Sequence, residues 1–402
     1  MIPRPFAGAL LLLALAGCEE APAPYACGFE ATHVHARAEG GRFDDVELVP
    51  HGDGARLVWS DRSGLHVARL DAEGRPRGAA RIATACPGGV GAAPRGEALV
   101  VACLRPGDRD RGRGGELVLL SVGEEGARAL GTLPGIGAES RGVALAIEGE
   151  RVVAGYRDAD ELTGRARIAE LADGALAPRE LSSEGVLASA PSLVFERGAL
   201  VAAWTESWFD PDGRPAGHLF VQREGEPPRP SLEVGDVDVH VRIARDERGL
   251  LVTLRDRRPR GAEHRSFVGR LDDRLRLTLG ALRSPGRANA PDSEPMLVPC
   301  GGDVFSVSTR TSSREVTMVS LRRLDAELRP VENEQQIYEY HARFPQAVGA
   351  CVGGQLLLAV GERGSASSPA PRLRTYDMRC GDGVIHERTP GTEGQVLGER
   401  GR

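Results

Sequence analysis

The chain has 402 residues, of which 27% are charged and 4% aromatic, and its formal net charge is −6. An acidic chain does not attract phosphate backbones, so we expect no nucleic-acid partner. The length permits a large core, in one repeat domain or in two ordinary ones.

The N-terminal residues predict export. Arg4 precedes an apolar stretch from Ala7 to Ala16, which is typical of a signal peptide. The stretch is too short to span a bilayer as a helix, which needs about 20 apolar residues.

The next residues, Leu15-Ala16-Gly17-Cys18, closely resemble the lipobox of bacterial lipoproteins. The resemblance implies a signal peptide over residues 1–17, a covalent lipid on Cys18 and a membrane anchor. Glu19 follows the cysteine where an aspartate would favour the inner membrane, so the resemblance points to the outer membrane, facing the periplasm or the surface. An ordinary cleaved signal with a chance cysteine is the alternative.

One apolar strand recurs along the chain, usually after a turn that contains glycine. Its copies are Arg56–Trp59, Ala98–Cys103, Arg151–Tyr156, Ala199–Trp204, Leu250–Arg255, Val304–Ser308 and Gln355–Val360. Their last residues lie 44 to 53 positions apart. A second strand follows each copy: Leu65–Leu70, Leu117–Leu120, Ala166–Ala169, Leu219–Gln222, Ser266–Leu271, Val316–Leu321 and Leu373–Tyr376.

Short β-branched runs between turns, repeated at this period, predict an all-β, seven-bladed β-propeller with four-stranded antiparallel blades. Six or eight blades remain alternatives. We expect a lipidated linker over 18–24, the propeller over 25–385 and a disordered tail over 386–402. The blades match no named propeller family well, so the resemblance is to a lipoprotein with divergent propeller repeats.

Seven cysteines are present, and six remain when Cys18 carries the lipid. Three disulfides suit an exported protein, and no CxxC pattern indicates a metal site. A propeller must close its ring, which brings an N-terminal strand beside the last blade. The repeat register therefore predicts three pairs: Cys27–Cys380, Cys86–Cys103 and Cys300–Cys351.

In propellers generally, ligands meet the face where the innermost strands begin. The repeat alignment places seven polar residues near those starts, around the central channel: Asp45, Arg141, Asp236, Asp238, His240, Glu294 and Arg343. Asp236, Asp238, His240 and Arg242 alternate along one strand face. They suit a divalent metal or a general base, but an ion-pair ladder between blades is the interpretation we favour.

We also expect several aromatic residues at this face of the ring. Trp208 and Phe209 lie in a polar loop and would suit carbohydrate or peptide binding, unless they fold back over a neighbouring blade. The pairs Trp59/Asp61, Tyr156/Asp158 and Trp204/Glu206 end the recurring strand. They could present carboxylates at the rim, although packing and turn capping explain them better.

No catalytic motif, cofactor motif or metal motif occurs. We therefore favour a monomeric, lipid-anchored binding or scaffolding module with a protein, peptide or carbohydrate ligand, and expect no cofactor beyond the lipid on Cys18. The alternative is a carbohydrate-active hydrolase that uses acidic residues around the central channel.

Overall fold

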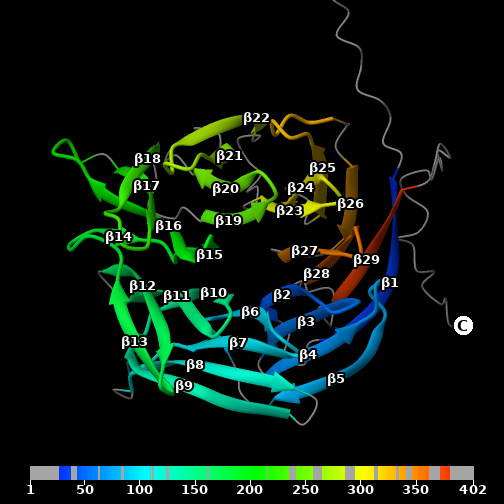
Figure 1. The fold of residues 1–402 in the computed structure, drawn as a ribbon, viewed down its shortest axis with the longest axis horizontal. Coiled ribbons are helices and arrows are strands. Elements are labelled where there is room, and N and C mark those ends of the chain that lie inside the picture. Colours follow the sequence, from blue (N-terminus) through cyan, green and yellow to red (C-terminus); the bar gives the residue numbers. More distant parts are fainter. Residues whose placement is uncertain are drawn as a thin grey trace, which may run out of the picture.

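The computed structural model describes residues 27–37, 43–61, 64–82, 86–108, 110, 113–123, 126–160, 163–213, 215–234, 241–256, 265–285, 295–311, 316–331, 335–340, 346–361 and 372–380. Within these ranges the chain forms strands and turns only, so it has no helix that could span a membrane. The strands form seven antiparallel blades around a central axis (Figure 1). The predicted all-β propeller is confirmed.

Each blade contributes one strand to each of four concentric layers. The innermost strands are β2 (Phe43–His51), β6 (Gly89–Arg95), β10 (Arg141–Glu148), β15 (Ser192–Glu196), β19 (Val241–Asp246), β23 (Met296–Cys300) and β27 (Gln346–Val352). The second strands are β3 (Gly54–Asp61), β7 (Ala98–Arg105), β11 (Arg151–Ala159), β16 (Ala199–Phe209), β20 (Gly249–Asp256), β24 (Asp303–Thr311) and β28 (Gln355–Gly361).

The two outer layers complete the blades. The third strands are β4 (Gly64–Leu70), β8 (Gly115–Gly123), β12 (Gly164–Ala172), β17 (Pro215–Arg223), β21 (Arg265–Leu271), β25 (Val316–Leu324) and β29 (Arg372–Cys380). The outermost strands are β5 (Pro76–Ile82), β9 (Gly126–Ile136), β13 (Ala175–Glu180), β18 (Arg229–Val234), β22 (Leu277–Pro285), β26 (Gln335–Tyr340) and β1 (Cys27–Arg37). Every copy of the recurring apolar strand lies in a second strand, and its follower lies in a third strand.

The hydrophobic core lies between the blades. Buried residues form seven clusters, and each cluster joins the facing sheets of two neighbouring blades. One cluster, for example, joins Val46 and Leu57 of the first blade to Val348 and Leu357 of the seventh. Second strands are therefore apolar on both faces, because each face packs against a neighbouring blade. This two-sided burial explains why they were the strongest signal in the sequence.

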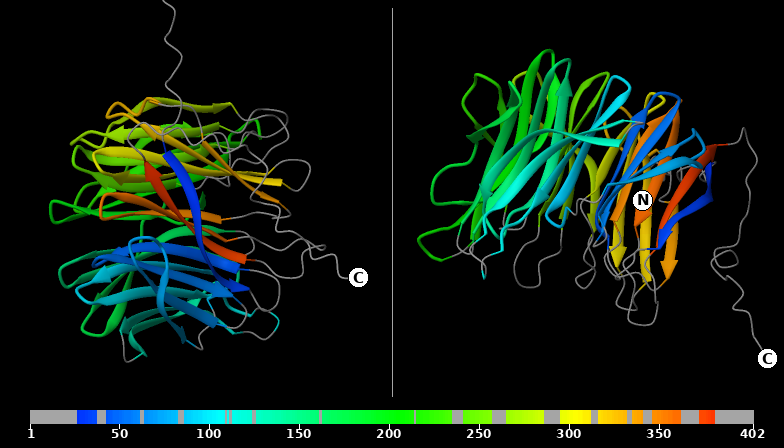
Figure 2. Two further views of the ribbon diagram at one scale, coloured as in Figure 1. Left: turned by 90° about the vertical axis from the view of Figure 1, so that its right-hand side faces the viewer. Right: turned by 90° about the horizontal axis from the view of Figure 1, so that it is seen from below.

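The ring closes between the two ends of the chain. β1 pairs antiparallel with β29 as the outermost strand of the seventh blade, and Figure 2 shows the two strands side by side. The register sets Cys27 opposite Cys380, although their disulfide itself stays a prediction. The other two predicted disulfides, Cys86–Cys103 and Cys300–Cys351, are confirmed, each with a Cα–Cα distance of 5.2 Å.

One short strand was not predicted. β14 (Leu187–Ala188) pairs in parallel with Gly164 of β12 and antiparallel with Glu206 and Ser207 of β16. It thereby joins the third and fourth blades into one continuous nine-stranded sheet. Backbone pairing through β14 consequently links the C-terminal part of β16 to the third blade.

Candidate functional site

The candidate site lies on the face of the ring where the innermost strands begin and the second strands end, which we call the strand-start face. β2 and β3 are antiparallel, so the start of β2 at Phe43 pairs with the end of β3 at Asp61. The same pairing holds in the other blades. Residues from different blades therefore meet at this face around the channel.

Asp45 accepts hydrogen bonds from residues of three blades beside the central axis of the ring. Its carboxylate accepts hydrogen bonds from the amide N of Val46 at 3.0 Å, the amide N of Val90 at 2.9 Å and Nε2 of Gln346 at 2.5 Å. These donors belong to the first, second and seventh blades. Burial raises the pKa of Asp45, and the hydrogen bonds from Gln346 and Val90 oppose that rise. This side chain is held by its neighbours in one position.

Two local features allow Asp45 to reach those donors. The pairing of β2 with β3 shifts register between Phe43 and Asp45, as at a β-bulge, which redirects the side chain. Gly89 faces the carboxylate with φ at +124°, and a Cβ on Gly89 would lie 3.1 Å from Oδ2 of Asp45. Only glycine combines this backbone conformation with such a close approach.

Glu47 lies two residues further along β2, on the same face of the strand. Asp45 and Glu47 are partly exposed, whereas Val46 and Leu48 between and beyond them are buried in the core. This alternation directs both carboxylates toward the channel. Burial raises the pKa of Glu47 to about 7; the positive charge of Arg242 opposes the rise and the negative charge of Asp45 adds to it. No described residue donates a hydrogen bond to this carboxylate.

One arginine from another blade acts on both acids, and a second begins an innermost strand nearby. Arg242 lies on β19 in the fifth blade, three blades round the ring from β2, and its positive charge opposes the rise in pKa of both Asp45 and Glu47. Arg141 is exposed and begins β10 in the third blade. Its neighbour Gly142 borders Gly89, as Asp45 does. The remaining channel candidates lie outside the described residues: Asp236, Asp238, His240, Glu294 and Arg343.

Metal binding finds no support in the described part of the chain, where no three His, Cys, Asp or Glu side chains form a group that could hold an ion. The sequence-based metal candidates, Asp236, Asp238 and His240, are not among those residues.

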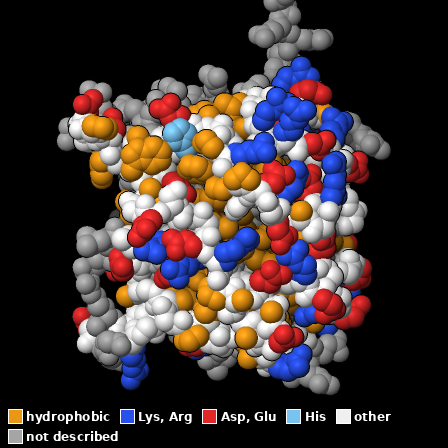
Figure 3. Space-filling view, turned by 60° about the vertical axis from the view of Figure 1, so that its left-hand side comes forward, with side chains coloured by type: hydrophobic (Ala, Val, Ile, Leu, Met, Phe, Trp, Pro, Cys, Tyr) orange, Lys and Arg blue, Asp and Glu red, His pale blue; other side chains and the backbone are white. Residues whose placement is uncertain are grey.

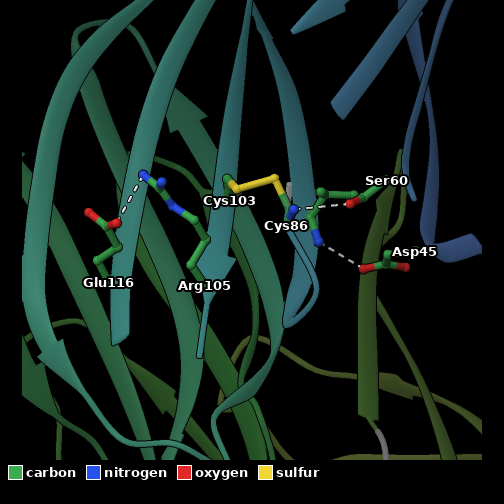
Figure 4. The surroundings of a disulfide bond; sticks show 7 residues. Asp45, Ser60, Cys86, Cys103, Arg105 and Glu116 are labelled. Carbon is green, nitrogen blue, oxygen red and sulfur yellow. Dashed lines mark hydrogen bonds and ion pairs between the residues drawn. A yellow bond between two sulfur atoms is a disulfide. The ribbon is translucent and has the colours of Figure 1, made fainter. Parts of the chain in front are cut away.

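A disulfide lies beside Asp45. Cys86 leads into the second blade and Cys103 lies near the end of its second strand, and the amide N of Cys86 donates to Oγ of Ser60 in the first blade at 3.1 Å (Figure 4). This covalent link holds the segment that carries Val90. It thus supports one of the three donors to Asp45.

The acids that end other second strands are not presented at the rim. Asp158 accepts hydrogen bonds from the amide N of Gly137 at 2.9 Å and Oγ of Ser140 at 3.3 Å, and it pairs with Arg167 at 3.0 Å. Glu206 is 3% exposed. It accepts from Nε1 of Trp204 at 2.9 Å and from the amide N of Ser183 at 3.0 Å. The interpretation as packing and turn capping is correct for both.

The aromatic candidates behave differently from each other. Trp208 is half-buried and stacks on His218 with ring centroids 5.3 Å apart, whereas Phe209 is 66% exposed. Figure 3 shows hydrophobic side chains with a histidine among them, and acidic side chains beside them, on this side of the ring. One aromatic side chain, Phe209, is therefore exposed to solvent at the end of β16.

Sequence reasoning missed Glu47 and β14. Glu47 carried a usable signal, because the alternation Asp45-Val46-Glu47-Leu48 sets two acids on one strand face. Its raised pKa was not predictable, since it depends on enclosure by other blades.

Comparisons with known proteins add the following. No family model and no curated protein matches the chain. Among solved structures, polysaccharide lyase Uly1 matches at TM-score 0.48 and 10% identity, over 90% of this chain and 94% of that one. A subtype N11 neuraminidase-like protein of A/flat-faced bat/Peru/033/2010 matches at TM-score 0.46 and 10% identity, over 90% and 96%. Trypanosoma rangeli sialidase matches at TM-score 0.45 and 10% identity, over 82% and 59%. Similarity at this level carries no argument about the site.

Proposed function

We propose that the protein is a carbohydrate-active hydrolase of the cell envelope that uses the acidic residues in its central channel. The observation that carries this proposal is Glu47, a channel carboxylate with a pKa of about 7, beside a second carboxylate on the same strand face. A group with this pKa exchanges a proton readily near neutral pH.

The spacing of the two carboxylates fits glycoside hydrolysis. Residues two apart on a strand are separated by about 7 Å. Glycosidases place their two carboxyl groups about 5 to 10 Å apart, one to protonate the leaving oxygen and one to act on the opposite side of the sugar. In this scheme Glu47 donates the proton. Asp45, oriented by three N–H donors, acts as the base that takes a proton from the attacking water, and the positive charge of Arg242 orients the sugar.

The test compares Glu47→Gln with Glu97→Gln, whose side chain is exposed in the turn between β6 and β7. Release of reducing ends would be measured on a panel of neutral and acidic polysaccharides. We expect Glu47→Gln to lower kcat roughly a hundredfold or more, while Glu97→Gln retains wild-type turnover. Wild-type activity should fall as pH rises above about 7. Unchanged turnover in Glu47→Gln, or no wild-type turnover on any substrate, would reject the proposal.

Protein stability supplies a second readout that confirms the variant folds. The folded pKa of Glu47 lies above its usual value of 4.5, so the folded state binds more protons than the unfolded state between about pH 4.5 and 7. The contribution of Glu47 to stability is therefore lost as pH rises through this window. Above pH 7, Glu47→Gln should be more stable than the wild type by at most about 3 kcal/mol. Below pH 4.5 this gain in stability should be absent.

The proposal includes the location of the protein at the outer membrane. The lipobox resemblance supports a lipid on Cys18 and an outer-membrane anchor, and the two disulfides suit an exported protein. Cys18→Ser should release the protein from the membrane fraction or block its maturation. Wild-type incorporation of labelled fatty acid into that variant would contradict this.

A binding module is the second candidate, and one observation favours it. Asp45 already accepts three hydrogen bonds, so it has little capacity left for a substrate. A wild-type protein that binds a polysaccharide tightly and hydrolyses none would select this function.

A further inference from the structure

The side chain of Gln346 reaches from the seventh blade to the first. Gln346 begins β27 and pairs with Gly361 at the end of β28. Its Nε2 donates to Oδ1 of Asp45 at 2.5 Å and to the carbonyl O of Val46 at 3.3 Å, and its Oε1 accepts from the amide N of Val46 at 3.1 Å. The carboxamide therefore binds both backbone polar groups of Val46, as a neighbouring strand would.

Val46 lies between the two channel acids, Asp45 and Glu47. β2 is the innermost strand of its blade, so β3 pairs with one of its edges and no described strand pairs with the other. The pairing with β3 also shifts register just before Val46, between Phe43 and Asp45. Strand pairing alone therefore holds this part of β2 less firmly. Gln346 supplies hydrogen bonds exactly between the two acids, and so it helps to fix the backbone from which both side chains branch.

The hydrogen bonds also distinguish the two carboxylate oxygens of Asp45. Oδ1 accepts from the amide N of Val46 and from Nε2 of Gln346, which uses the capacity of about two hydrogen bonds that one such oxygen has. Among the described residues, the donor to Oδ2 is the amide N of Val90. Gly89 lacks a Cβ, which would lie 3.1 Å from Oδ2. Oδ2 is therefore the oxygen that can accept from one more donor.

We propose that Gln346 is a positioning residue for the acid pair, which it holds through Val46, and that it leaves Oδ2 of Asp45 to receive the proton of the attacking water. The inference rests on the proposed function and extends it by assigning that atom. In the step, Glu47 protonates the leaving oxygen as the glycosidic C–O bond breaks. The water oxygen bonds to the anomeric carbon, and one water proton passes to Oδ2.

The amide of Gln346 also favours the ionised form of Asp45, which a base requires. Burial raises the pKa of Asp45, and the hydrogen bond from Gln346 is the largest of the effects that lower it. The positive charge of Arg242 lowers it too, the nearby acid on the same strand is Glu47, and β27 carries no charged residue. Loss of the amide donor should therefore raise the pKa of Asp45.

The activity test compares Gln346→Leu with Gln222→Leu. Gln222 is the matched control, because it is half-buried and its Nε2 donates to the carbonyl O of Glu226 in the fourth blade at 2.8 Å. Gln346 does not touch the sugar in this scheme, so Gln346→Leu should lower kcat roughly tenfold or more and leave KM nearly unchanged. The acidic limb of its pH profile should move to higher pH. Gln222→Leu should keep the wild-type values.

A second variant, Gln346→Glu, keeps the length of the side chain and an acceptor for the amide N of Val46. It lacks the amide donor and adds a carboxylate beside Asp45, so it should move the acidic limb further than Gln346→Leu does. This variant also carries the test if the leucine variant does not fold.

A titration without substrate separates this inference from the proposed function. NMR of the labelled side-chain carboxyl carbon, assigned with Asp45→Asn, follows the pKa of Asp45 in the full chain. That pKa should be higher in both Gln346 variants than in the wild type, and unchanged in Gln222→Leu. An unchanged pKa in the folded variants would overturn the inference, whether or not the protein hydrolyses a glycan.

Turnover then decides the rest. A wild-type kcat and pH profile in folded Gln346→Leu would overturn the inference and leave the hydrolase standing. A raised pKa of Asp45 in a protein that hydrolyses no substrate would support the positioning of Asp45 by Gln346 and reject the hydrolase.

Discussion

The second strands of the fourth and first blades carry the same pattern, a tryptophan and an acid two residues later, yet the two pairs form different hydrogen bonds. In the fourth blade, Nε1 of Trp204 donates to Oε1 of Glu206 at 2.9 Å. In the first blade, Nε1 of Trp59 is buried and has no hydrogen-bond partner among the described residues. Asp61 instead lies 3.3 Å from Nε2 of His66.

The ring partners differ in the same way. His66 occupies the position opposite Trp59, and its ring stacks on the indole with centroids 4.9 Å apart. Phe220 occupies the position opposite Trp204. Aspartate is one methylene shorter than glutamate, and in the first blade it binds the histidine. Equivalent positions in a repeat therefore do not guarantee equivalent hydrogen bonds, because side-chain reach decides which donor is satisfied.

The second blade replaces the aromatic residue with a disulfide, and removing a disulfide should have a larger effect than any of the side-chain changes below. Cys103 occupies the position of Trp59 and Trp204, and it is bonded to Cys86 across 17 residues. The double variant Cys86→Ala/Cys103→Ala should lose about 3 kcal/mol of stability in urea unfolding. Removing Cys300–Cys351, whose separation is 51 residues, serves as the control and should cost somewhat more. A loss below about 1 kcal/mol for the second-blade pair, or a loss larger than that for Cys300–Cys351, would contradict this prediction.

Glu206→Ala should have the next largest effect. It leaves the buried indole N–H of Trp204 without an acceptor, which costs roughly 1 to 3 kcal/mol. Glu206→Gln keeps an oxygen in reach of that donor and should cost clearly less. Urea unfolding of both variants gives the difference. Equal losses would show that the charge of Glu206, and not its hydrogen bond to Trp204, stabilises this blade.

Sequence patterns predicted the ring because each blade repeats the same requirement, an apolar second strand packed on both sides. Two of the three predicted disulfides, Cys86–Cys103 and Cys300–Cys351, are confirmed and followed from the register of those repeats. The hydrogen bonds and the charge interactions within the site were not predictable in the same way. The pKa of Glu47 is raised by burial within the assembled ring, against the opposing charge of Arg242 from a distant blade. β14 has only two residues, too few to carry a pattern. Trp59 and Trp204 look alike in sequence, and only the positions of their neighbours distinguish them.

Replacing each tryptophan with phenylalanine should cause smaller losses of stability. The difference between the two losses tests the hydrogen bonding of the indole N–H directly. Trp204→Phe leaves the buried carboxylate of Glu206 without one of its two donors, so we expect a loss of about 2 kcal/mol. Trp59→Phe removes an N–H that has no partner, and this relief partly offsets the lost packing. Its cost should be about 1 kcal/mol lower than that of Trp204→Phe. Similar losses of stability at the two positions would contradict the difference in hydrogen bonding between the two indole N–H groups.

The smallest expected effect comes from giving the first blade the side chains of the fourth. In the double variant Asp61→Glu/His66→Phe, the longer acid can reach Nε1 of Trp59, and a phenyl ring replaces the imidazole that Asp61 binds. Each single change should destabilise, because Asp61→Glu crowds His66 and His66→Phe removes the imidazole that lies against Asp61. The double variant should recover about 1 kcal/mol relative to their sum, the net value of one buried hydrogen bond. A double-mutant cycle in urea measures this coupling, and the indole N–H resonance of Trp59 should move as the bond forms. Additive losses with an unchanged resonance would show that side-chain reach does not explain the difference between the two blades.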